Sequence, residues 1–169
     1  MRRIMALALA LLLCGCAAGA QQEELLIYYP AGPESETLLG TEVWAQGEPT
    51  VEALVERMLT PPESEALTNP YPQGVRLRGW SLEEGTLTLD FSETYSDLAG
   101  VSLTLANFCA VATCTQLPGV QRLYITVEGQ PLPEGSSGPF APEDVLETGE
   151  GENEPENPTD HIDEAGESK

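Results

Sequence analysis

The chain has 169 residues, with 28 acidic side chains and only seven basic ones, so its formal net charge is −21 at pH 7. This length indicates one domain with appended segments. The charge argues against nucleic-acid binding, which requires a basic surface, and against a polybasic membrane patch. Apolar residues make up 41% of the chain, which is enough for the core of a domain of about 100 residues.

The first 15 residues have the features of a signal peptide. Two arginines precede an apolar run, residues 4–13, which is shorter than the roughly 20 residues of a membrane-spanning helix. Residues 13–16, Leu-Cys-Gly-Cys, resemble the bacterial lipobox, which implies cleavage before Cys16 and a diacylglyceryl group on its sulfur. Because two acyl chains anchor a protein stably, we expect residues 1–15 to be a lipoprotein signal peptide. The mature chain would then lie on the extracytoplasmic face of the cell membrane. A plain secretory signal cut elsewhere and an uncleaved helix are the alternatives.

A short tether precedes the expected domain. Residues 16–24 are small and polar. Residues 25–30, LLIYYP, form a continuous apolar and aromatic run, which predicts a strand that ends at its proline. Residues 41–46 fit either a second short strand or an extended connector. Apolar side chains at positions i, i+3, i+4, i+7 and i+8 from Val51 predict an amphipathic helix that is capped by Thr50.

Residues 75–92 contain the clearest structural signal in the chain. Apolar and polar residues alternate on both sides of a Glu-Glu-Gly sequence, which predicts a β-hairpin with one buried and one solvent-exposed face. Gly85 can adopt the positive φ that such a turn requires. Trp80 and Leu82 are one residue out of phase with the earlier apolar positions, so we expect a bulge near Gly79.

A second helix is predicted over residues 101–117, with Ser102 as a candidate N-cap. Cys109 and Cys114 lie five residues apart on it, so their Cα atoms should be more than about 7 Å apart, too far for a disulfide. We expect both to be small buried apolar side chains. Residues 120–128 alternate again and predict the last strand.

These elements predict an α+β domain over residues 25–133. Its two helices should pack on one face of a small, mainly antiparallel sheet, in the chain order β-α-β-β-α-β, with Leu54, Leu89 and Phe108 facing one another in the core. The remainder, residues 134–169, is dominated by Gly, Ser, Pro and acidic residues. Because it has little apolar area to bury, we expect it to be an acidic disordered tail.

The sequence resembles the GerMN domain of bacterial sporulation and germination proteins. The resemblance covers residues 25–132 and depends on the order and spacing of short motifs. These are LLIYYP at 25–30, MLTP at 58–61, PQGVRL at 72–77, GTLTLDFS at 85–92, ATCTQLPGV at 112–120 and VEG at 127–129. Cys114 stands where the family usually has Leu. The resemblance implies a compact fold that is related to ring-building motifs, is not known as an enzyme fold and acts as an interaction module of the cell envelope.

No catalytic, cofactor or metal site is predicted. His161 is the only histidine and lies in the expected tail, which argues against a nucleophile activated by histidine and against most zinc sites. Asp90 and Glu93 are the one carboxylate pair that could hydrolyse a cell-wall glycan. Hydrogen bonding of Asp90 to the backbone at the end of its strand is the simpler interpretation.

We therefore expect a non-catalytic, lipid-anchored protein of the cell envelope whose GerMN-like domain binds a protein partner or itself, in sporulation or spore germination. The alternatives are a protein that binds or acts on peptidoglycan and a soluble secreted factor. A partner could pair with an edge strand at 25–29 or 120–127. It could also contact aromatic side chains, if these gather on one face: Tyr28, Tyr29, Trp44 and Trp80.

Overall fold

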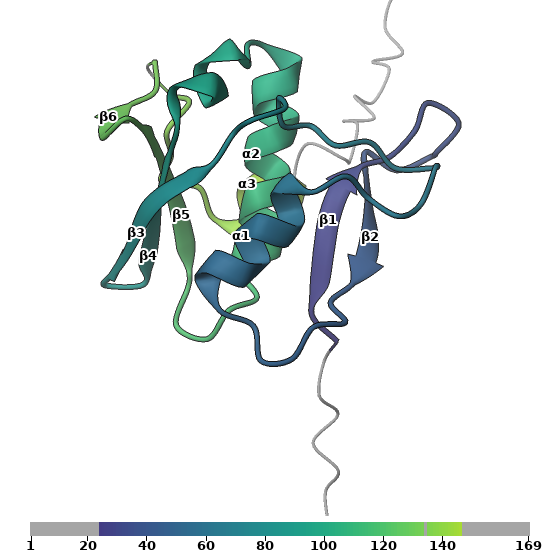
Figure 1. Cartoon of the computed structure of the whole chain (residues 1–169), viewed down its shortest axis with the longest axis horizontal. Coiled ribbons are helices and arrows are strands. Elements are labelled where there is room, and N and C mark those ends of the chain that lie inside the picture. The colour runs from purple at the N-terminus through teal and green to yellow at the C-terminus, as the bar shows by residue number, and fades with distance from the viewer. Residues whose placement is uncertain (1–23, 134, 147–169) are drawn as a thin grey trace, which may run out of the picture.

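The computed structural model describes residues 24–133 and 135–146 (Figure 1). Cys16, the expected signal peptide, nearly all of the tether, the end of the tail and His161 lie outside these residues. Within them, no helix is long and apolar enough to cross a membrane. The elements follow in this order: β1 (Leu26–Pro30), β2 (Leu39–Val43), α1 (Val51–Leu59), β3 (Leu77–Glu83), β4 (Thr86–Phe91), a 3-10 turn η1 (Glu93–Asp97), α2 (Val101–Cys114), β5 (Arg122–Val127), β6 (Gln130–Pro131) and α3 (Pro142–Leu146).

The α+β class is confirmed, but the strands form two sheets instead of the single sheet that the sequence predicted. β1 and β2 pair antiparallel with each other, and the larger sheet has the order β3-β4-β5-β6. β4 and β5 are parallel because α2 forms the crossover between them, whereas β3 and β6 are antiparallel to their neighbours. Figure 1 shows the larger sheet on the left and the β1–β2 hairpin on the right, with α1 and α2 between them.

The β3–β4 hairpin has the predicted turn. Glu84 and Gly85 both have positive φ, 49° and 79°, so the connection is a two-residue turn of the type that matches strand twist. The register shifts between Leu77 and Gly79, which confirms the expected bulge. The β4 residues then alternate as predicted between half-buried polar and fully buried apolar side chains.

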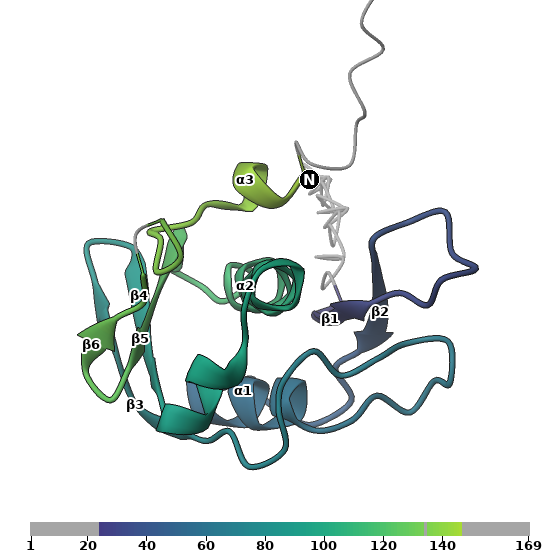
Figure 2. The same ribbon diagram turned by 90° about the horizontal axis from the view of Figure 1, so that it is seen from above.

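Helix α2 is the centre of the molecule. Seen from above in Figure 2, it is surrounded by the larger sheet, α1, the β1–β2 hairpin and α3. Consecutive residues from Ala106 to Val111 are all buried, so the helix has no solvent-exposed face along this stretch. The helix begins after Gly100, not after Ser102, and ends at Cys114, three residues before the predicted end. An interior position explains why its sequence is apolar on every side.

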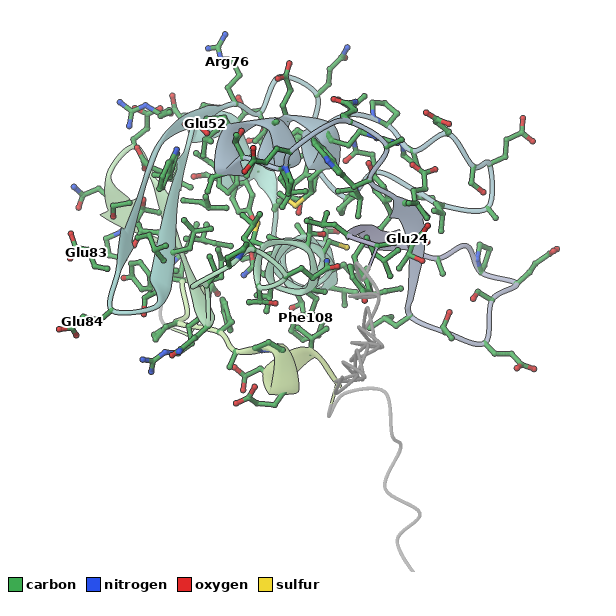
Figure 3. The ribbon with its side chains drawn as sticks, turned by 90° about the horizontal axis from the view of Figure 1, so that it is seen from below. Glu24, Glu52, Arg76, Glu83, Glu84 and Phe108 are labelled. Carbon is green, nitrogen blue, oxygen red and sulfur yellow. The ribbon has the colours of Figure 1, made fainter. Side chains whose placement is uncertain are left out.

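The core lies between α1, α2 and the two sheets. Leu54 and Leu89 are fully buried there, and Phe91 stacks on Tyr95 with 4.7 Å between ring centroids. Phe108 was expected in the same cluster, which was wrong. It is buried on the other side of α2, toward α3 (Figure 3), where it lines a hollow with Gly135, Ser136 and Phe140.

Residues 135–146 are part of the domain, so the expected start of the disordered tail at residue 134 was too early. Phe140 and Leu123 exchange two backbone hydrogen bonds of 2.8 Å, and the Ser137 carbonyl accepts one from the Ile125 N–H. Phe140 and Val145 pack against the core. Two apolar side chains in a segment of polar composition were too weak a signal to predict this packing.

Candidate functional site

The carboxylate of Asp90 is engaged in a hydrogen-bond network. Its Oδ1 accepts hydrogen bonds from the Thr126 hydroxyl (2.9 Å) and the Gly129 N–H (2.7 Å), and its Oδ2 pairs with Arg78 at 2.7 Å. Partial burial would raise the pKa of Asp90, but these three partners together hold it below its ordinary value. The group is therefore ionised at neutral pH and suited to joining β3, β4 and the turn after β5.

Glu93 does not complete a catalytic pair with Asp90 in this arrangement. Glu93 joins the network through its backbone N–H, which donates to the Glu128 carboxylate at 3.1 Å, and Glu128 also pairs with Arg78 at 3.2 Å. A glycosidase acid needs a raised pKa, so that it holds a proton at neutral pH. The low pKa and the hydrogen-bond partners of Asp90 fit the structural interpretation instead.

A second polar network fixes the β1–β2 hairpin to α1. Arg57 forms an ion pair with Glu42 and donates a hydrogen bond of 2.5 Å to the Tyr29 hydroxyl, which in turn donates to the Arg57 carbonyl. Glu42 also accepts from the N–H groups of Glu63 and Ser64, at 2.7 and 2.9 Å. Burial raises the pKa of Tyr29 to about 12, against the opposing effect of Arg57. Because every polar group has a partner here, the network stabilises the fold and offers no free group for chemistry.

The two cysteines of α2 are buried and unpaired, as predicted. Burial raises the pKa of the Cys109 and Cys114 thiols to about 12 in each case. The thiolate is the reactive form of cysteine, so at neutral pH both groups are in the unreactive protonated form. In the part of the chain that the structure describes, no cluster of three or more His, Cys, Asp or Glu side chains could hold a metal ion.

The aromatic side chains do not gather on one face. Tyr29 is in the core, Trp44 is partly buried with its indole N–H bonded to the Gly47 carbonyl, and Tyr28 lies beside α2 and α3. Trp80 is the exception, because it is 43% exposed on β3. Beside it, Leu82 is 40% exposed. In the sequence, Trp80 and Leu82 are marked only by a break in the alternation of apolar and polar residues, which does not predict that both side chains are exposed.

The comparison with family models agrees with this geometry. Residues 26–133 match the family model Germane, which is described as sporulation and spore germination. The chain belongs to this GerMN family. The match begins at β1 and ends just after β6, so it covers both sheets, α1 and α2 and leaves out α3.

One solved structure shows the same fold at low sequence identity. The tandem GerMN domains of the sporulation protein GerM from Bacillus subtilis align with 70% of this chain at 19% identity and a TM-score of 0.52; the aligned part is 44% of that structure. This GerMN chain therefore spans less than half of the tandem structure. The first GerMN domain of GerM alone aligns with 69% of this chain at 14% identity and a TM-score of 0.48, and the aligned part is 93% of that structure. A candidate lipoprotein from Clostridium perfringens aligns with 73% of this chain at 20% identity and the same TM-score, and the aligned part is 90% of that structure. No curated protein matches the sequence.

Proposed function

We propose that this protein is a non-catalytic, lipid-anchored component of the cell envelope whose GerMN domain binds other envelope proteins during sporulation or spore germination. Membership of the GerMN family, over residues 26–133, is the observation that supports this proposal most directly. The chemistry of the domain agrees with it. Its best carboxylate candidate, Asp90, is held in the ionised form by Arg78 and two other donors, and both thiols are buried.

The lipid anchor is proposed from the lipobox-like sequence that ends at Cys16. Metabolic labelling with a palmitate analogue tests it. Cys16→Ala should abolish both the labelling and the membrane association, whereas Cys14→Ala, which changes the neighbouring cysteine of the signal peptide, should leave both unchanged. Equal labelling of the two variants would contradict the anchor and favour a secreted protein.

The interaction role is tested by crosslinking in intact cells, followed by recovery of the anchored protein from membranes. We expect a discrete protein adduct that is absent when the folded domain is disrupted. Incubation with purified peptidoglycan sacculi is the companion experiment. Stable binding to sacculi or release of muropeptides, without any protein adduct, would replace the proposal with the peptidoglycan alternative.

A further inference from the structure

One strand edge of the larger sheet is open. Among residues 24–133 and 135–146, β4 is the only strand that pairs with β3. The opposite end of the sheet is covered, because β5 pairs with β6 and with the segment around Phe140. The free edge of β1 is also covered, since Thr113 of α2 and Gln116, in the turn after α2, bond to the backbone of Leu26 and Tyr28. An open edge presents unpaired N–H and C=O groups to a partner.

The register shows which backbone groups are available. Glu83 and Thr86 flank the two-residue turn, and such flanking residues form a hydrogen-bonded pair. Hydrogen-bonded and non-bonded pairs then alternate, so Ser81 also bonds to β4. The N–H and C=O groups of Trp80 and Leu82 therefore point away from β4, toward the open edge.

The side chains of these two residues extend the core face of the sheet. Trp80 lies opposite Leu89 and Leu82 lies opposite Leu87, and directly opposite residues share a face. Leu87 and Leu89 are fully buried, whereas Trp80 and Leu82 are 43% and 40% exposed at the margin. The Trp80 indole N–H donates a 2.7 Å hydrogen bond to the Glu52 carboxylate on α1, which fixes the ring against the helix.

A groove runs between α1 and the start of β3. Its volume is about 460 Å³. Its apolar lining comes from Leu59 of α1 and from Val75 and Leu77. Its polar lining comprises Glu52, Glu56 and Thr60 on the helical side and Arg76 beside β3, so the acidic side chains outnumber the basic one. An edge strand that faces a helix across a groove is a geometry that accepts an added extended strand.

We propose that the open edge of β3 and this groove bind an extended, cationic segment of a partner protein, in which basic and apolar residues alternate. The segment would pair its backbone with Trp80 and Leu82 and direct its basic side chains toward Glu52 and Glu56. This inference names the partner class for the interaction role proposed above and rests on it.

Charge selects this occupant over others. The basic side chains of the described residues are Arg57, Arg76, Arg78 and Arg122, and Arg57 and Arg78 form ion pairs with acidic residues. A second copy would bring a chain of the same formal net charge, −21, to the edge, so long-range repulsion between the copies opposes self-association. The chain's own residues after 146 are rich in Asp and Glu, with Lys169 as their one Lys or Arg residue, so they are repelled as well. Both self-association and tail binding are therefore disfavoured.

The charges also give the segment a direction. Figure 3 shows Arg76 at one end of the β3–β4 hairpin and Glu83 and Glu84 at the other. All three side chains are exposed. A segment with its highest positive charge at one end would place that end beside Glu83 and Glu84.

The probe is a fluorescein-labelled, acetylated and amidated octapeptide of four Lys-Val repeats, titrated into the full chain in nonionic detergent and followed by fluorescence anisotropy. We expect saturable binding, and no binding of the matched Glu-Val octapeptide. Leu82→Pro removes an N–H that points away from β4, so it should keep the hairpin and weaken binding by roughly tenfold. Circular dichroism checks that this variant folds.

The double variant Glu52→Gln/Glu56→Gln keeps the shape of α1 and should weaken binding about fivefold, since two charges facing the peptide are lost. Glu34→Gln/Glu36→Gln removes the same charge from the exposed β1–β2 loop and should leave binding unchanged. Equal weakening by both double variants, or absence of binding, would overturn the inference. A dimer in analytical ultracentrifugation that is lost in Leu82→Pro would assign the edge to a second copy and also overturn it. A crosslinked envelope partner recovered without peptide binding would refute this inference while leaving the proposed function intact.

Discussion

Asn107, in the middle of α2, provides the sharpest test of how this fold is held together. It is 3% exposed. Its Oδ1 accepts a 2.7 Å hydrogen bond from the Tyr95 hydroxyl, and its Nδ2 donates a 2.8 Å hydrogen bond to the Ser136 carbonyl. One side chain thus connects the central helix to η1 and to the segment after residue 134.

Asn107→Ala should destabilise the domain substantially. The buried Tyr95 hydroxyl loses its acceptor, which costs about 1–3 kcal/mol, and the lost bond to Ser136 adds about 1 kcal/mol. The higher helix propensity of Ala returns about 0.5 kcal/mol. We expect a net loss of about 1.5–3.5 kcal/mol in the free energy of unfolding, equivalent to a decrease in Tm of roughly 10 °C for a domain of this size.

Urea unfolding of the full chain, followed by far-UV circular dichroism, measures this loss. Tyr95→Phe removes the hydroxyl that Asn107→Ala leaves without a partner, so the double variant should be more stable than the sum of the single effects by about 1–2 kcal/mol. A loss below about 0.5 kcal/mol in Asn107→Ala, or strictly additive single effects, would show that the hydrogen bond is not the source of the stability.

Three further predictions concern the turn, the thiols and Asp90. Gly85→Ala should lower the free energy of unfolding by about 1–2 kcal/mol in the same urea assay, because φ is 79° and the new Cβ would lie 2.9 Å from the Gln121 side chain; an unchanged midpoint would contradict this. Cys109 and Cys114 should react with Ellman's reagent at pH 8 only after unfolding, and rapid labelling of the native chain would refute their burial. Because folding raises the pKa of both thiols from 9.0 to about 12, their contribution to stability should be complete below pH 9 and disappear as pH rises toward 12. The folded-state pKa of Asp90 is lowered from 3.8, so its stabilising contribution is present above that pH and lost as pH falls through the folded value; Asp90→Asn should flatten the acid limb of the stability curve, and an unchanged acid limb would contradict this.

The sequence predicted those elements whose formation depends on a short repeating pattern of apolar and polar residues. The apolar stripe of α1 and the alternation of the β3–β4 hairpin each repeat over several residues, and both elements form where expected. Thr50 caps α1 as predicted, because its hydroxyl oxygen accepts a 3.2 Å hydrogen bond from the Ala53 N–H. The bulge near Gly79 could also be predicted, because an extra residue in one strand is what shifts the phase of an alternating sequence.

The arrangement of the sheets could not be predicted in the same way. Whether β1 joins the hairpin sheet depends on Thr113, at the end of α2, and Gln116, in the turn that follows. Both bond to the edge of β1, whereas polar residues near a helix end usually point to solvent. The role of Asn107 was also missed, because a lone amide in an apolar stretch does not show which groups it bonds to. The available signal was one amide within the otherwise apolar stretch of residues 105–112, but its two hydrogen-bond partners are distant in the sequence. The edge of β3 is open because, among the described residues, β4 is the only strand that pairs with β3. The residue pattern within β3 does not predict which strands pair with it.

The position of β1 has a mechanical consequence if the chain is anchored at Cys16. Tension between the membrane and a bound partner would enter the domain at Leu26, the first residue of β1. In the described residues β1 belongs to a separate sheet from β3, so the load would pass to α2 through Gln116 and Thr113 and to α1 through Arg57 before it reached the larger sheet. The small hairpin could then yield under force while the β3 edge kept its shape.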